Sequence, residues 1–132
     1  MRKYQERKLV LDAKAATGIG VPMDVTDYDS IVLDFGTASS GNLTVKFQGS
    51  MAKAMPDFGA AQTVANQWDY VQVKDLEDGS AIDGDTGIAP AGTDDFRQFE
   101  VNVSALKWFN AVVTARSAGS VTVGATLFSQ GD

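Results

Sequence analysis

The chain has 132 residues and a formal charge of -6 at pH 7, and it contains neither cysteine nor histidine. This length fits one domain that buries about two-thirds of the surface its unfolded chain would expose. The composition excludes disulfides, thiolate or imidazole metal sites and a histidine base, and the negative charge argues against a nucleic-acid binder. We therefore expect a protein without enzymatic activity, cofactor or bound metal.

The first eight residues form a basic segment ahead of the first predicted strand, with Glu6 as its only acid. Its basic side chains are Arg2, Lys3, Arg7 and Lys8. Either this segment is a solvated chain end, or it is a docking arm that becomes ordered on a partner. We divide the chain into this arm, residues 1–8, and one β domain, residues 9–132. The four basic side chains are the candidate partner-binding residues.

The same segment bears on the compartment in which the protein is found. It is charged where a signal peptide requires an apolar core, and no apolar run in the chain approaches the length of a membrane span. We expect a cytosol-like compartment and no membrane partner.

Alternating apolar residues predict the first strands. Leu9, Leu11 and Ala13 share one face of a strand, and the glycines of the following loop lack the spacing of a dinucleotide-binding fingerprint. Residues 31–35 and 43–47 alternate in the same way, with large apolar side chains on one face. The polar, glycine-containing stretch 37–41 has the composition of a turn, so we expect these two strands to pair with each other.

The middle of the chain contains a long loop and a further strand. Alternation stops over residues 50–66, where Pro56 and Gly59 limit any helix, and a loop of this length is a candidate contact surface. Residues 68–76 alternate again, with Trp68 and Tyr70 on one face. Those two aromatic side chains are either core residues or a platform for a sugar.

Residues 75–95 contain seven acids and neither lysine nor arginine. Flexible acidic loops supply oxygen ligands for calcium, although the spacing here is not that of an EF-hand. The alternative is that these acids keep the protein soluble and prevent strand edges from pairing.

The last third alternates most regularly. Residues 99–103, 109–115 and 121–127 each place apolar side chains on one face, and the polar stretch 117–120 predicts an antiparallel hairpin between the last two runs. Seven strands without a helical period predict an all-β, antiparallel β-sandwich of Greek-key or jelly-roll type. The expected core residues are Leu33, Phe35, Val45, Phe47, Val71, Val101, Phe109, Val113, Val123 and Leu127.

Three stretches carry a resemblance to a known class of protein: KFQGSMAKAMPDF, WDYVQVKDLEDGSAIDGDTGI and FEVNVSALKWFNA. With the apolar strands around SAGSVTV, they resemble the small structural proteins of tailed-bacteriophage particles. The resemblance implies a non-enzymatic β-sandwich that binds the capsid as a decoration or cement protein. It further implies the major capsid protein and copies of the chain itself as partners, often in a trimer, and a place in the virion after assembly in the host cytoplasm.

Many such proteins attach through an N-terminal segment that is ordered only on the shell, which is the role implied for Arg2, Lys3, Arg7 and Lys8. The resemblance also leaves open a tail or fibre component. A carbohydrate-binding module that uses Trp68 and Tyr70 is the alternative function, and exposure of those two side chains separates it from the first. An enzyme ranks third, because the sequence offers many carboxylates but no way to select a catalytic pair.

Overall fold

The computed structural model describes residues 3–129, and over this range the chain forms strands, turns and loops without a helix. In chain order the strands are β1 (Lys3–Lys14), β2 (Gly18–Ile19), β3 (Met23–Asp24), β4 (Ser30–Ser50), β5 (Asp69–Tyr70), β6 (Val73–Asp75), β7 (Ala81–Ile82), β8 (Phe96–Asn102) and β9 (Trp108–Ser129). All strand pairs are antiparallel. The predicted all-β, antiparallel class is therefore confirmed. Within the described range there is no helix long and apolar enough to cross a bilayer.

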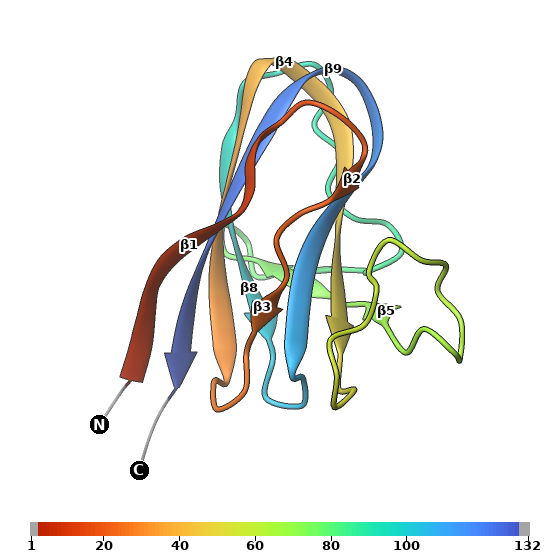
Figure 1. Cartoon of the computed structure of the whole chain (residues 1–132). Coiled ribbons are helices and arrows are strands. Elements are labelled where there is room, and N and C mark those ends of the chain that lie inside the picture. The colour runs from red at the N-terminus through yellow and green to blue at the C-terminus, as the bar shows by residue number, and fades with distance from the viewer. Residues whose placement is uncertain (1–2, 130–132) are drawn as a thin grey trace.

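Two long, bent strands, β4 and β9, build both layers of the fold (Figure 1). Residues 30–38 of β4 pair with residues 120–128 of β9, and residues 42–50 of β4 pair with residues 108–118 of β9. The first layer continues into β1 on one side and into β8, β6 and β7 on the other. The second layer is completed by β2 and β3 on β9 and by β5 on β4. The sheet is thus folded over itself, and the core lies between its two halves.

The fold in the sheet depends on a few residues where β4 and β9 bend together. Ser39 and Ser40 both have a φ of 59°, and Gly119 has a φ of 74°. A Cβ on Gly119 would lie 2.5 Å from the Cα of Gly41 and 2.6 Å from the carbonyl oxygen of Ala38. The two strands therefore touch backbone to backbone at the bend, and the amide of Ser40 is held by Asp94 Oδ1 at 2.7 Å.

The bend corrects two predictions. The hairpin expected at residues 117–120 is wrong, because β9 passes through this stretch as one continuous strand. The pairing expected between residues 31–35 and 43–47 is also wrong, because both belong to β4 and each pairs with β9 instead. Small polar residues and positive φ angles bend these strands without reversing the chain, and a sequence pattern does not distinguish the two outcomes.

The predicted inward faces are confirmed for most strands. Nine of the ten expected core residues are buried, and Val71 is half-buried against the core. Phe35 packs edge-on against Phe99, and Phe47 stacks on Phe109, with ring centroids 5.9 Å apart in both pairs. Burial of these large side chains is the main source of stability in such a sandwich.

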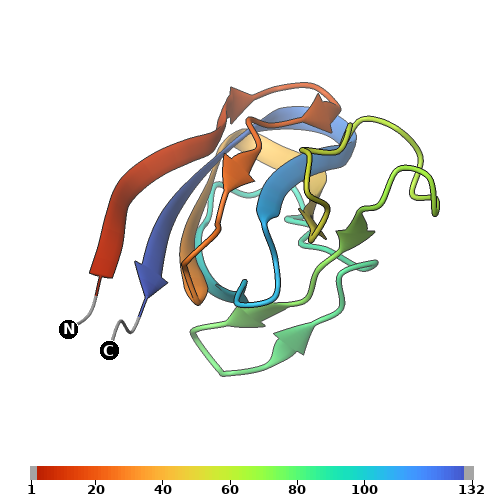
Figure 2. The ribbon, with the colours of Figure 1, turned by 60° about the horizontal axis from the view of Figure 1, so that its bottom comes forward.

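Two segments differ in register from the prediction. In β1 the buried residues are Val10 and Leu11, while Leu9 is exposed, because irregular pairing with β9 shifts the alternation there. The strand expected over residues 68–76 is divided into β5, which pairs with β4, and β6, which pairs with β8. The chain crosses from the second layer to the first between them (Figure 2).

Candidate partner-binding surface

The basic segment of the sequence lies largely within β1. This strand begins at Lys3, so the boundary drawn at residue 8 falls inside it, and Lys8 is paired with Ala125 of β9. Arg2 lies outside the described residues. Figure 1 shows β1 along one side of the end of β9, whose other side pairs with β4, so β1 is the edge of the first layer there. Tyr4, which is 66% exposed, packs against Phe128 of β9 at this edge.

Arg7 joins three strands on the outer face of the first layer. Its Nε donates to Asp34 Oδ2 at 2.7 Å and its Nη2 donates to Asp34 Oδ1 at 2.6 Å. Because Asp34 belongs to β4, the Arg7 side chain crosses β9 to reach it, and it does so over Gly124, where a Cβ would lie 2.2 Å from the Arg7 Nε. Hydrogen bonding to Asp34 raises the pKa of Arg7 above its ordinary value. Arg7 thus clamps β1 to the sheet.

Sequence reasoning missed Asp34 and Gly124 as the partners of Arg7. A glycine inside an apolar strand is a signal for close approach of another group, and Gly124 interrupts the run VTVGATL. Asp34 gives a weaker signal, because outward-facing acids are common on strands. Lys8 is exposed, so its charge remains available on the same strand.

The aromatic side chains considered as a sugar platform lie at a groove of about 460 Å³ on the outer face of the second layer. Trp68 is 7% exposed and meets Tyr70 edge-on, with ring centroids 5.0 Å apart. The Lys46 ammonium lies 4.9 Å from the centre of the Tyr70 ring. Trp68 is therefore a packing residue, and this arrangement does not favour the carbohydrate-binding alternative.

The long loop, residues 51–67, is anchored on the same outer face. Gln48, itself buried, donates from Nε2 to the carbonyl oxygen of Phe58 at 2.9 Å, and Trp68 donates from Nε1 to the carbonyl oxygen of Ala60 at 3.1 Å. Phe58 is 2% exposed and packs against Trp68. The loop contains a small apolar cluster of its own, which is separate from the core between the layers.

Replacing Phe58 with alanine should destabilise the protein by about 3 to 5 kcal/mol, because the deletion leaves a cavity beneath the loop. Val64 lies on the same loop and is 95% exposed, so Val64→Ala should change the free energy of unfolding by no more than about 0.5 kcal/mol. Urea denaturation of both variants measures the difference. Equal stabilities would mean that the loop is not held by Phe58.

The acids of residues 75–95 serve several different purposes. Asp75 is buried in an ion pair with Arg97, and Asp94 caps the bend in β4. Asp78 accepts hydrogen bonds from the amide and hydroxyl of Ser80, which lower its pKa. In the described part of the chain, no group of three or more acids lies close enough to hold a metal ion.

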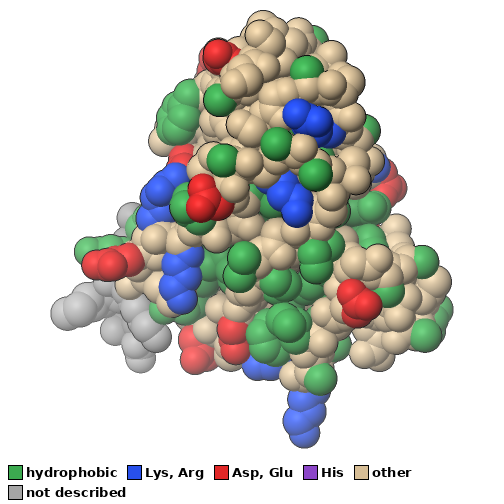
Figure 3. Space-filling view, turned by 45° about the horizontal axis from the view of Figure 1, so that its top comes forward, with side chains coloured by type: hydrophobic (Ala, Val, Ile, Leu, Met, Phe, Trp, Pro, Cys, Tyr) green, Lys and Arg blue, Asp and Glu red, His purple; other side chains and the backbone are tan. Residues whose placement is uncertain are grey.

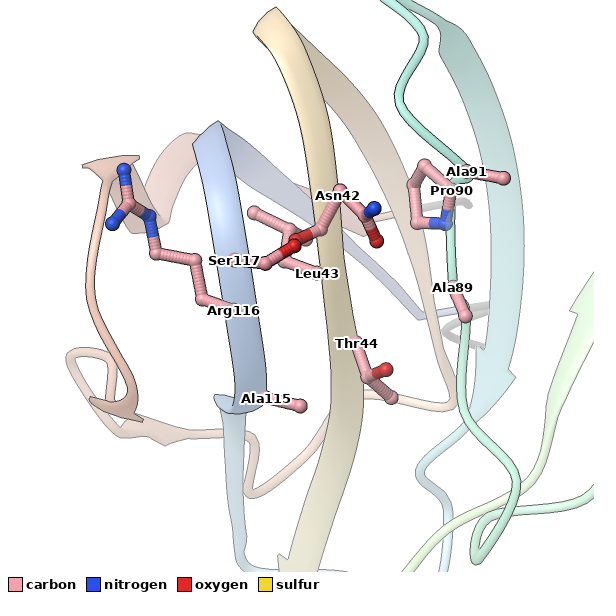
Figure 4. A pocket seen from close by; sticks show the side chains of 9 residues that line it. All are labelled: Asn42, Leu43, Thr44, Ala89, Pro90, Ala91, Ala115, Arg116 and Ser117. Atoms are coloured by element: carbon pink, nitrogen blue, oxygen red, sulfur yellow. The ribbon is translucent and has the colours of Figure 1, made fainter.

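On the face shown in Figure 3, neither positive nor negative side chains form a continuous patch, and hydrophobic side chains lie among charged groups of both signs. A hollow of about 330 Å³ lies beside the bend of the two long strands. Figure 4 shows the Pro90 ring facing Asn42 across this hollow, with Ala91 directed away from the two strands and Arg116 on the far side of β9. It offers no constellation for catalysis, and the open edge at β1 remains the candidate surface.

Comparison with known proteins identifies the fold. No family model matches the chain, and no curated protein sequence matches it. Among solved structures it is similar to the SPBc2 prophage-derived protein YomS, with a TM-score of 0.72 and 10% identity over 98% of this chain and 96% of that one. It is also similar to the PBSX exported protein XepA, with a TM-score of 0.73 and 12% identity over 97% of this chain and 38% of that one. The chain therefore shares its fold with these two proteins, of which YomS is named as prophage-derived.

Proposed function

We propose that this chain is a non-enzymatic structural protein of a phage particle, which binds and stabilises the capsid surface as a decoration or cement protein. The single observation that carries the proposal is the likeness of the fold, over nearly the whole chain, to a prophage-derived protein of the same extent. Its partners in this role are the major capsid protein and further copies of the chain, with a trimer as the expected assembly.

The surface of the protein suits attachment by contact area. Among the described residues, the exposed large apolar side chains are distributed over β1, the loop of residues 51–67, the start of β8 and two other connections. They are Tyr4, Leu9, Val21, Met51, Met55, Val64, Leu76 and Phe96. Contacts that lock neighbouring shell subunits together require such side chains next to polar groups. The basic residues Arg2, Lys3, Arg7 and Lys8 are proposed as the charged part of the contact, with Arg7 fixing β1 in position.

The test is rebinding to particles. Purified protein should sediment with phage particles that lack it, and binding should decrease between about 0.05 M and about 0.5 M salt, because the charged contacts are screened. Quantitative protein analysis of purified virions should find the chain in a fixed ratio to the major capsid protein. Recovery of the chain from the medium or the host cell, and not from particles, would contradict the proposal. Recovery from the medium would instead suggest an exported protein, as XepA is named.

A further inference from the structure

The first layer ends in two open edges, and these edges differ in charge. β1 lies at one end of the strand order and β7 at the other. Figure 2 shows them on opposite sides of the molecule, β1 in red and the β6 and β7 segment in green. β1 carries four lysines and arginines against two acids. β7 lies within the segment of seven acids without lysine or arginine.

The acids next to β7 face the solvent. Glu77 and Asp78 precede the strand, Asp83 and Asp85 follow it, and all four are exposed. On β1, Lys8 is exposed, and Tyr4 and Leu9 add exposed apolar surface. The carbonyl oxygen of Val10 accepts a hydrogen bond from the Val21 amide, so a contact along β1 is confined to the residues before it. Both edges carry side chains that a complementary edge can meet.

Charges on an edge strand commonly prevent pairing with other chains, and one sign on both edges serves that purpose, since two copies then repel each other. Here the two edges have opposite signs. The edge of β1 in one copy is consequently attracted to the edge of β7 in another, while contacts between like edges are disfavoured.

We propose that copies of this chain associate edge to edge, with β1 of one copy lying against β7 and its flanking acids in the next. Because the two surfaces are different, the contact is head-to-tail. It repeats from copy to copy, and the rotation between neighbouring copies closes the assembly into a ring. The inference deepens the proposed function, since it names the surfaces by which copies associate, but it concerns the isolated protein and is tested without particles.

The experiment is a charge exchange across the contact. Lys8→Glu and Asp85→Lys each reverse one side, and the double variant restores opposite signs while keeping the net charge of the intact chain. Neither side chain takes part in the clamp between Arg7 and Asp34 or in the core. Lys53→Glu, at an exposed position of the loop of residues 51–67 and outside both β1 and the acidic segment, is the matched control for a reversed lysine.

Sedimentation equilibrium over a range of protein concentrations, at about 0.05 M and about 0.5 M salt, measures association. We expect the intact protein to associate more tightly at low salt, each single variant to associate about tenfold more weakly, and the double variant and Lys53→Glu to resemble the intact protein. A monomer at every concentration and salt overturns the inference. So does a double variant as weak as the single ones, or a control that is equally weakened. Particle binding by a protein that remains monomeric would leave the proposed function standing and remove only this contact.

Discussion

Gly119→Ala should destabilise the protein by about 3 kcal/mol or more, even though it adds a single methyl group. Part of the cost, about 1 to 2 kcal/mol, arises because φ is 74° there, in the left-handed region that a Cβ disfavours. The rest arises because the new Cβ would lie 2.5 Å and 2.6 Å from backbone atoms of β4, which has no flexible side chain to displace at that point. The bends of β4 and β9 would have to separate.

Gly79→Ala is the matched control for this substitution. Gly79 has a φ of 77°, and a Cβ added there meets no atom within 4 Å, so its cost should be limited to about 1 to 2 kcal/mol of backbone strain. Thermal unfolding of both variants gives the comparison, and the difference isolates the close approach of the two strands. If the two alanine variants melt at the same temperature, the bends are not in contact in solution.

Val113→Asp is expected to cost about 4 kcal/mol or more, because it places a carboxylate without a partner in the core. Val113 is 1% exposed and lies opposite Val45 in the second layer. The neighbouring residue, Thr114, is exposed on the other face of β9, so Thr114→Asp should change the free energy of unfolding by about 0.5 kcal/mol or less. Chemical denaturation of the two variants measures this difference.

The comparison between residues 113 and 114 tests the register of β9. A shift of one residue would move every side chain of the strand to the opposite face. A variant at residue 114 that is as unstable as the variant at residue 113 would show that the strand is displaced, whereas stability of both would place this part of β9 outside the core.

The inward faces of the strands were predictable, but the partners of the strands were not. Alternation places Phe35 and Phe47 inward whether the strands that carry them form a hairpin or one bent strand, because the period of two is local. Pairing depends on the direction of the chain after residues 37–41 and 117–120, and glycine and serine permit both a reversal and a bend. Asp94 helps to hold the bend by accepting a hydrogen bond from the Ser40 amide. Because Asp94 lies 54 residues from Ser40, no local sequence pattern reveals this contact.

The candidate site was predictable in composition and not in conformation. Counting charges identifies the basic segment. Sequence alone places it outside the β domain because residues 3–8 carry few apolar side chains. In the structure they are held by backbone pairing to β9 and by the pair between Arg7 and Asp34, and neither of these requires an apolar pattern. The division of the strand over residues 68–76 was equally hidden, because its two halves belong to different layers.

The central position of β9 has a consequence for biosynthesis. β1, β2, β3 and β4 all pair with it, although it follows all of them in the chain. Most of the sheet therefore has no template until residues 108–129 have left the ribosome, and the loops that must then close span nearly the whole chain. Such non-local pairing places folding in the range of about milliseconds to seconds. Until then β4 has exposed apolar side chains and unpaired edges, so a nascent chain stalled before β9 should be a substrate for chaperones, whereas a chain that includes β9 should fold in one cooperative step.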